Sequence, residues 1–288
     1  MTITSPSQDA EVDATVTITG TCRSGVAITL GGSGLQGPST VACAAGTFAT
    51  TVAFSESDGT KLLTVTQGPV SITRTFHRVT PAKLRSSSVA TQGSQGSTVD
   101  CDLVIARPFE VHAGDLVFGM IYADTGNTGT VSTPDFQRTG LDKFSHVAFW
   151  KVAAQDEPTA YTFHVVAGTG GGDTCESAGV LLAFSGVAST PILAESAVFD
   201  SNDASVVAPG VTTPKRGVLV AAWGSNGPMP GFAQTGMEIG AMAVSPGDFA
   251  NVLVAFQGVQ PGPTGDRTAT LPATRAAAAG LFVLDGKP

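Results

Sequence analysis

The sequence predicts an all-β protein with two domains. Glycine (35 residues) and proline (17 residues) recur along the 288-residue chain, and the runs between them are short and rich in Val, Thr, Phe and Ala. Only 13% of the residues are charged, and no stretch keeps a helical period for more than about two turns. Short β-branched and aromatic runs between turn residues are typical of strands. The best helix candidate, 274–279, is short and poorly capped, so we expect little helix.

Charge and hydropathy exclude several classes of partner. The net charge is −8, and the 15 lysines and arginines are scattered, whereas nucleic-acid binding needs them clustered. No run approaches the roughly 18 apolar residues of a membrane span. Residues 1–6 lack the basic and apolar regions of a signal peptide, so we expect that a leader was either removed or never used.

Four cysteines divide evenly between the two predicted domains. Cys22 and Cys43 lie in the first, Cys101 and Cys175 in the second, which suggests two disulfides, Cys22–Cys43 and Cys101–Cys175. The alternative is four buried thiols in a protein kept reduced. No Cys-x-x-Cys or His-x-x-x-His spacing indicates a metal site, and no cofactor is expected. Disulfides would imply exposure to an oxidising exterior.

The first 79 residues contain about seven strand candidates separated by turn signals. The candidates begin with the N-terminal segment and continue through 15–20, 26–30, 39–43, 48–54, 61–67 and 70–79. Asp58-Gly59, between two alternating runs, indicates a hairpin.

Four motifs in this region resemble the bacterial immunoglobulin-like repeat. They are Ile3-Thr4-Ser5-Pro6, the strand 16–21, Gly46-Thr47-Phe48 and Asp58-Gly59-Thr60. The resemblance covers residues 1–79 and implies an Ig-like sandwich that acts as a spacer or weak adhesive unit without catalytic residues. Cys22 and Cys43 depart from the family pattern, so a disulfide here would be an addition to it.

Residues 80–86, with a proline, charges and a serine run, form the expected linker. The second domain, 87–288, shows an apparent internal duplication with half-copies at about 107–187 and 208–286. Segment 134–140 matches 230–236, 147–158 matches 252–263 at a constant offset, and 178–179 matches 279–280. Such a repeat fits two four-stranded halves packed face to face. The alternative is that any Gly-rich β protein yields similar runs by chance.

Residues 87–288 also resemble a jelly-roll-like domain of phage structural proteins and large bacterial surface proteins. The segments that support the likeness are 111–117, 148–153, 156–158 and 183–187. The resemblance concerns the scaffold and brings no site motif. The predicted fold is therefore an N-terminal Ig-like sandwich followed by a jelly-roll-type β-sandwich with internal pseudo-duplication.

No catalytic residue is expected. The four histidines (His77, His112, His146 and His164) have no nucleophile motif nearby. His146 lies two and four residues from Ala148 and Trp150, which favours a packed or strand-edge histidine over a general base. Asp156-Glu157-Pro158 favours a turn over a carboxylate pair, because adjacent residues on an extended chain point apart.

Two loop regions are candidates for ligand binding. An exposed Trp223 beside Ser225 and Asn226 could stack on a sugar ring; the alternative is a tryptophan at the rim of the core. Asp200, Asn202 and Asp203 offer oxygen ligands for calcium; the alternative, favoured over a metal, is a solvated Asx-turn.

These features together predict a non-enzymatic phage virion structural protein: a head-decoration, neck or fibre component on the virion surface. Expected partners are other virion proteins and host surface polysaccharide. We also expect a homo-oligomer, for which low charge and apolar runs are compatible with a trimer. The alternative is a secreted bacterial adhesin or carbohydrate-binding module at the cell surface. A glycan-cleaving enzyme on the same scaffold is the third hypothesis.

Overall fold

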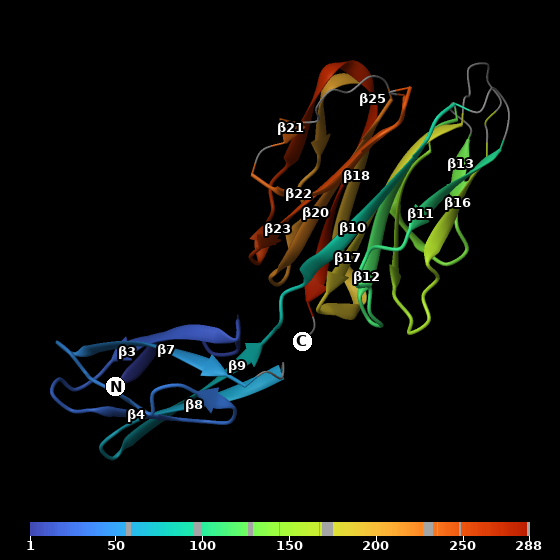
Figure 1. Ribbon diagram of the computed structural model, residues 1–288. Coiled ribbons are helices and arrows are strands. Elements are labelled where there is room, and N and C mark those ends of the chain that lie inside the picture. Colours follow the sequence, from blue (N-terminus) through green and yellow to red (C-terminus); the bar gives the residue numbers. More distant parts are fainter. Residues whose placement is uncertain are drawn as a thin grey trace. The chain divides into compact units, whose positions relative to one another are not determined.

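The structure, a computed structural model, describes all residues except 56–58, 95–99, 126–128, 144, 167, 169–174, 227–232, 235, 248 and 287–288, and it leaves out the side chains of 200–202, 233–234 and 272. The described residues form strands and no helix, so the all-β prediction is confirmed. None of them belongs to a helix that could cross a membrane. The chain divides into two compact units, Met1–Pro81 and Ala82–Asp285 (Figure 1). Because strand β10 begins at Lys83, the expected linker 80–86 is too long.

The first unit is a sandwich of two sheets. One has the order β1-β3-β7-β5 and the other β2-β9-β8-β4-β6. The neighbours β1-β3-β7 and β9-β8-β4 match strands A-B-E and G-F-C of an immunoglobulin domain, and the Ig-like prediction is confirmed at the level of the fold. The strands are β1 (Thr2–Ser5), β2 (Ala10–Val12), β3 (Thr15–Thr21), β4 (Ile28–Gly31), β5 (Leu35–Gln36), β6 (Thr40–Val41), β7 (Thr47–Phe54), β8 (Gly59–Gln67) and β9 (Val70–Arg78).

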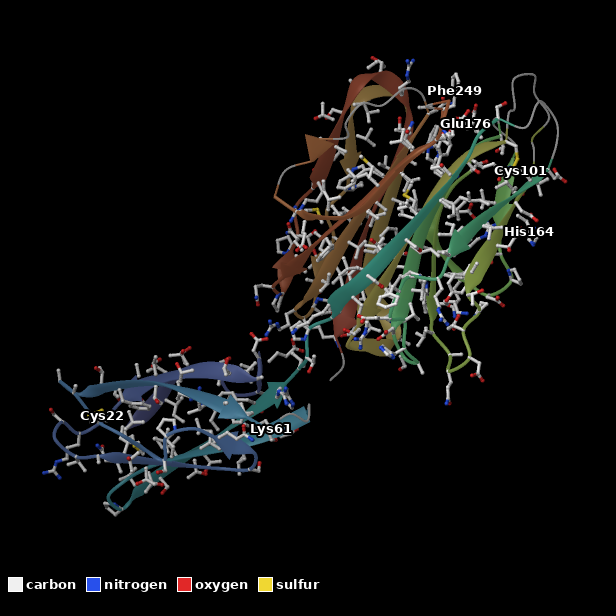
Figure 2. The ribbon with its side chains drawn as sticks, viewed as in Figure 1. Cys22, Lys61, Cys101, His164, Glu176 and Phe249 are labelled. Carbon is white, nitrogen blue, oxygen red and sulfur yellow. A yellow bond between two sulfur atoms is a disulfide. The ribbon has the colours of Figure 1, made fainter. Side chains whose placement is uncertain are left out.

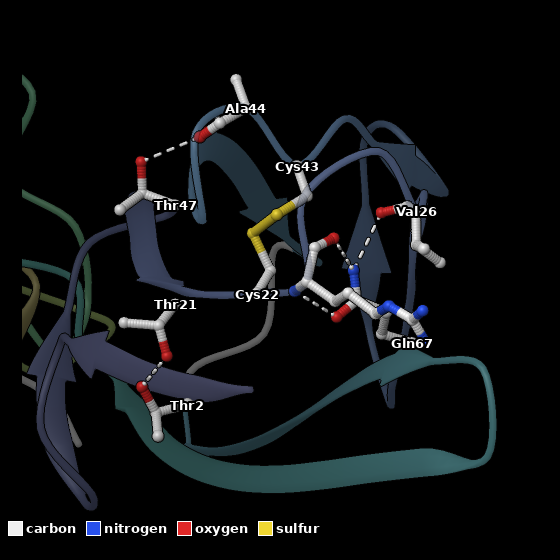
Figure 3. The surroundings of a disulfide bond; sticks show 9 residues. Thr2, Thr21, Cys22, Val26, Cys43, Ala44, Thr47 and Gln67 are labelled. Carbon is white, nitrogen blue, oxygen red and sulfur yellow. Dashed lines mark hydrogen bonds between the residues drawn. A yellow bond between two sulfur atoms is a disulfide. The ribbon is translucent and has the colours of Figure 1, made fainter.

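The Cys22–Cys43 disulfide joins the residue after β3 of one sheet to a residue shortly after β6 of the other, near the strand ends (Figure 3). The place of the inter-sheet bridge of antibody domains is taken by an apolar core that includes Ile18, Leu63 and Phe76. Next to the disulfide, the buried Gln67 accepts a hydrogen bond from Arg23 N–H and donates to the carbonyls of Arg23 and Val26. The disulfide and Gln67 therefore tie the loop after β3 to the rest of the unit.

The hairpin expected at Asp58-Gly59 is wrong. β7 pairs with β3 and β5, whereas β8 pairs with β9 and β4, so the chain changes sheets between β7 and β8. The hairpin forms one strand later, where Gln67 pairs with Val70 across a two-residue turn. Alternating polar and apolar residues on both sides of a turn fit a hairpin and a connection between two sheets equally well. In either case each strand has one buried face.

The second unit contains two large sheets that share one order of five strands, and in the second sheet β21 pairs with β25 as a sixth strand. Their orders are β10-β17-β12-β15-β14 and β18-β25-β20-β23-β22, so the same five positions recur in two halves of eight strands each. The first half comprises β10 (Lys83–Gln92), β11 (Cys101–Ala106), β12 (Leu116–Asp124), β13 (Thr130–Ser132), β14 (Gln137–Lys143), β15 (His146–Val152), β16 (Ala160–Val166) and β17 (Glu176–Ser185). The second comprises β18 (Val187–Ala208), β19 (Thr212–Thr213), β20 (Gly217–Ser225), β21 (Ala233–Gln234), β22 (Glu238–Val244), β23 (Asn251–Val259), β24 (Gly262–Pro263) and β25 (Arg267–Gly286).

These two sheets pack face to face around a central apolar core. Phe118, Met120 and Tyr122 of β12 point into it, as do Val220 and Phe282 from the second half. The rings of Phe118 and Phe282 lie 5.0 Å apart across it. Both faces of each sheet are covered, which explains the continuous apolar runs in the sequence.

Each half also has an outer core of its own. In the first half, Ile121 and Leu181 face Leu103 and Phe163 of the three-stranded sheet β11-β16-β13. In the second half, the long strands β18 and β25 continue past the large sheet, and Val206 and Leu271 cover its outer face. Every half is thus a sandwich in itself, not one four-stranded layer as predicted.

The halves are related as the subunits of a two-fold dimer. Edge strand β10 lies beside β22, and edge strand β14 lies beside β18. Because β10 corresponds to β18 and β14 to β22, the contact is the same in both directions, which is the pattern of an isologous interface. The second unit is a fused pseudo-dimer.

The duplication is present, but its predicted bounds and register are wrong. The halves span 83–185 and 187–286 rather than 107–187 and 208–286. The match of 147–158 to 252–263 pairs Val147, which faces an outer core, with Val252, which faces the central core. A shift of one residue moves a strand's side chains to the opposite face, and similar apolar residues on both faces hide that shift in the sequence.

The helix candidate 274–279 belongs to β25. Ala277, Ala278 and Ala279 are fully buried between β20 and the neighbouring layers. Tertiary packing at a central strand outweighs the helix propensity of alanine.

Both predicted disulfides form, Cys22–Cys43 and Cys101–Cys175, and they give the first prediction. Both tryptophans and both tyrosines of the chain lie in the second unit, so tryptophan fluorescence reports its unfolding alone. Replacing Cys101 and Cys175 by alanine opens a 74-residue loop and is expected to lower the free energy of unfolding measured by fluorescence in urea by about 4 kcal/mol.

The matched control is the double alanine variant of Cys22 and Cys43. It should leave the fluorescence transition unchanged and lower the stability of the first unit by about 3 kcal/mol, as followed by hydrogen exchange. An equal shift of the fluorescence transition in both variants would contradict the assignment of one structural disulfide to each unit.

Candidate functional site

A surface pocket of about 400 Å³ lies at the start of β11 and the end of β16. Its lining combines polar and aliphatic residues: Asp100, Cys101, Asp102, His164, Val165 and Val166. Figure 2 labels Cys101 and His164 on the two neighbouring strands. Strand alternation explains the site: Leu103, Phe163 and Val165 are buried in the outer core, so Asp102 and His164 face outward.

Asp102 and His164 form an ion-pair-type contact across the two strands. The two residues are directly opposite in the ladder, and His164 Nδ1 lies 2.6 Å from Asp102 Oδ1. Their side chains are 54% and 55% exposed, so the contact is in water and adds little to stability. It does fix the orientation of the imidazole, whose Nε2 has no partner among the described residues.

Ser132 lies opposite His164 on the other side, so serine, histidine and aspartate stand in one row across β13, β16 and β11. The Ser132 hydroxyl makes no hydrogen bond to any described residue, and both other members are more than half exposed. A nucleophilic triad needs a hydroxyl in contact with the imidazole and a buried carboxylate. The row therefore lacks the geometry of a triad.

The disulfide Cys101–Cys175 borders the pocket and lies where the two halves differ. In the second half, β18 and β25 each run without interruption from the large sheet into the outer layer. In the first half, β10 and β11 together take the place of one long strand, and β16 and β17 take the place of the other. The disulfide joins the first residue of β11 to the residue before β17, beside both of these breaks.

The predicted sugar platform is not formed. Trp223 is 0% exposed, and alternation along β20 places it with Leu219 and Ala221 in the outer core of the second half. Ser225 is buried as well, and half-buried Asn226 donates from Nδ2 to Asp124 Oδ1 at 3.2 Å. An indole without exposed surface cannot stack on a sugar ring, so the stacking hypothesis for Trp223 and Ser225 is wrong.

The weak calcium candidates are only partly described. The side chains of Asp200 and Asn202 lie outside the described residues. Asp203 is exposed, and its Oδ1 accepts a hydrogen bond from Ser205 N–H at 3.0 Å, as in an Asx-turn. Among the described residues no group of three His, Cys, Asp or Glu side chains is placed to hold a metal ion.

Glu157 is a structural residue that sequence reasoning assigned only to a turn. Its carboxylate is 3% exposed and accepts from Lys151 Nζ at 2.9 Å, Ala154 N–H at 2.6 Å and the Tyr161 hydroxyl at 2.8 Å. Burial opposes ionisation of this carboxyl, but those hydrogen bonds and the lysine charge outweigh it and hold the pKa of Glu157 below its ordinary value. Burial, followed by the bond to Glu157, raises the pKa of Tyr161.

Glu176 connects the two halves and was missed in the sequence. It lies at the start of β17, is 1% exposed, and its Oε1 accepts from the Ser245 hydroxyl and from the N–H groups of Gly247 (2.8 Å) and Phe249 (3.2 Å) (Figure 2). A Cβ at position 247 would lie 2.3 Å from Glu176 Oε2, so any residue larger than glycine there would force the carboxylate to move. A Ser-Pro-Gly turn after an apolar strand signals a loop, but nothing in the sequence identifies the carboxylate that the loop binds.

Comparisons with known proteins give no family. No family model matches the chain, and no curated protein matches it. Among solved structures, the chain is similar to the titin domains Z1Z2 in complex with telethonin, at 17% identity, over 59% of this chain and 90% of that one, with a TM-score of 0.25. A chimeric titin Z1Z2 carrying a decorin peptide gives 17% identity, 58% and 89% coverage and a TM-score of 0.19. Superposition at these values is poor, and neither likeness bears on function.

The Glu157 network gives the second prediction. Because its pKa is lowered in the folded state, the carboxylate contributes stability above its unfolded pKa, near 4.5, and that contribution is lost as the pH falls through the folded value. Glu157→Gln is expected to lower the free energy of unfolding by about 2 kcal/mol at pH 7, and by much less at pH 3. Urea unfolding at both pH values measures the difference. The exposed neighbour provides a control, since Asp156→Asn should change little at either pH.

The Glu176 contact gives the third prediction. Glu176→Ala leaves one hydroxyl and two N–H groups without their acceptor, and should cost about 3 kcal/mol. Amide hydrogen exchange within 245–250 should accelerate more than elsewhere in the unit. Asp203→Ala removes an exposed carboxylate that also accepts a backbone N–H and should have a far smaller effect. Unchanged exchange in 245–250 would show that Glu176 does not hold this loop.

Proposed function

We propose that the protein is a non-enzymatic structural component of a phage virion, a head-decoration, neck or fibre protein exposed on the particle surface. Its role is to present rigid β-sandwich units, and its partners are neighbouring virion proteins, with self-association into a homo-oligomer such as a trimer. The jelly-roll-like resemblance of the second unit belongs to this proposal.

The observation that supports the proposal best is how the buried carboxylates of the second unit are used. Asp115 bonds His112 N–H and pairs with Arg85, and Asp285 pairs with Lys215. Glu157 and Glu176 each hold a turn. Buried acids that bond to turns and basic side chains stabilise a scaffold, whereas general acids and bases must reach a substrate.

The pseudo-dimer and the disulfides favour the same role. A central core shared by two sheets, with an outer core on either side, gives one stiff body. One disulfide in each unit suits a protein that works in an oxidising exterior. The negative net charge favours a soluble surface and disfavours nucleic acid as a partner.

The glycan part of the proposal needs a site other than Trp223, because that side chain is buried. Exposed loops of the second unit are the natural place for such contacts, since loops on a rigid sandwich carry most binding residues.

Immunogold labelling with antibodies against the full chain tests the proposal. On purified particles from the source, label is expected at a repeated position on the virion. Label confined to the cell envelope or to particle-free culture supernatant would contradict the virion role and select the adhesin or carbohydrate-binding alternative.

A further inference from the structure

We propose that the seam between the edge strands β10 and β22 is the surface through which two copies of this chain associate. The seam comprises Val89 of β10 and residues 239–244 of β22, and its exposed apolar side chains are Val89, Ile239 and Met242. Because the proposed homo-oligomer would form through this surface, the inference rests on the proposed function and deepens it.

The edge strands β14 and β22 occupy equivalent places in the two halves. Each begins opposite an aromatic residue that packs against the central core, Trp150 for β14 and Phe256 for β22. The second residue of β14 is Arg138, and that of β22 is Ile239. The ladder partners of these two residues both face an outer core, so the two positions correspond.

A second pair of equivalent positions lies nearer the end of each strand. Asp142 pairs with Val147, and Met242 pairs with Leu253. Both partners face an outer core and lie three residues before the aromatic residue of their strand. In the first half, Arg138 and Asp142 form an exposed ion pair at these two positions.

The second half has exposed apolar side chains where the first half has that ion pair. Ile239 is 56% exposed and Met242 is 45% exposed. A single exposed apolar residue needs no explanation, but neighbouring ones on the same strand mark an interaction site. Since the scaffold is the same in both halves, the fold itself does not require apolar residues at these positions.

The edge of β22 lacks the protection that β14 has. Edge strands carry unpaired backbone N–H and C=O groups, and charged side chains protect them from pairing with another chain. β14 carries Arg138, Asp142 and Lys143, whereas residues 239–244 of β22 carry no charge. Both strands have a register irregularity, so charge and not a bulge distinguishes them.

Strand β10 adds to the same surface. The Ser88 hydroxyl donates to the carbonyl of Ala106 at 2.6 Å, on the side of the outer layer. Alternation therefore turns Val89 to the other face, where β22 lies. Farther along the seam, a Cβ at Gly93 would lie 3.7 Å from Pro246, so the two strands stay together over this stretch.

Charge favours a second copy as the occupant. Two chains with a net charge of −8 repel each other, so their contact must lie where acids are absent. The opposite seam, between β14 and β18, carries Lys143 and Glu195 besides the ion pair. The β10–β22 seam is uncharged and offers a charged partner no counter-charge.

The second copy supplies a matching strand. Two antiparallel β22 strands form an isologous contact, the commonest kind between identical chains, and main-chain hydrogen bonds join two edges in this way. Glu238 is the acid of β22, and antiparallel pairing places its two copies at opposite ends of the contact. The proposed homo-oligomer is then a dimer.

Sedimentation velocity of the full chain over a series of concentrations tests the inference. We expect a reversible dimer for the unchanged chain. The double variant Ile239→Arg, Met242→Asp transfers the ion pair of the first half to β22, and should raise the dissociation constant at least about tenfold. Because tryptophan fluorescence reports the second unit, an unchanged urea transition of the isolated monomer confirms that the variant is folded.

Cross-linking locates the contact. All four native cysteines are paired, so an introduced thiol reacts alone. Met242→Cys lies near the middle of residues 239–244 and should give a covalent dimer on mild oxidation, seen on a non-reducing gel. Asp142→Cys, at the equivalent position of the first half, is the matched control and should stay monomeric.

The outcomes are distinct from those of particle labelling, because both experiments use isolated protein. A chain that stays monomeric at every concentration, a double variant that associates as strongly as the unchanged chain, or equal cross-linking of both cysteine variants would overturn the inference. A monomeric chain whose label on the virion is lost with the double variant would assign the seam to a different virion protein instead of a second copy, and would leave the virion role intact.

Discussion

The apolar contact between the two large sheets is the interaction on which the second unit depends. Each sheet uses one face for this central core and the other for an outer core, so every central strand is covered on both sides. The central core and the two outer cores exclude water, so buried polar groups in the strands need hydrogen-bond partners from the protein itself. The buried polar side chains accordingly gather near strand ends, where turns supply partners, as at Glu157 and Glu176.

Duplication explains both the symmetry and its exceptions. The halves repeat one strand order and meet in an isologous contact, which is what fusion of two identical subunits would produce. They differ where the first half has two shorter strands in place of each long one, and the Cys101–Cys175 disulfide lies beside these breaks. A surface pocket in the described part of the chain borders this disulfide. The candidate site thus lies where the two halves of the pseudo-dimer differ.

The candidate site shows how alternation on a sheet creates a binding surface without a deep cleft. Burial of Leu103 and Phe163 places Asp102 and His164 side by side on the outward face. Their separation of 62 residues in the sequence gives no indication of this contact, because cross-strand register is set by the fold. Trp223 illustrates the converse: its place before a Gly-Ser-Asn loop allowed either an exposed side chain or one at the rim of the core, and alternation along β20 directs it fully into the outer core.

The sequence alone determined the fold class, the Ig-like first unit, both disulfide pairings and the presence of a repeat, because turn residues, period-two patterns and paired cysteines act locally or within one domain. Tertiary structure decided the bounds and register of the halves, the eight-stranded form of each, and which polar groups meet. The reason is physical. In strands covered on both faces the inward and outward residues are equally apolar, so the sequence carries no signal for which face turns toward which core. Only packing of the complete sheets resolves that choice.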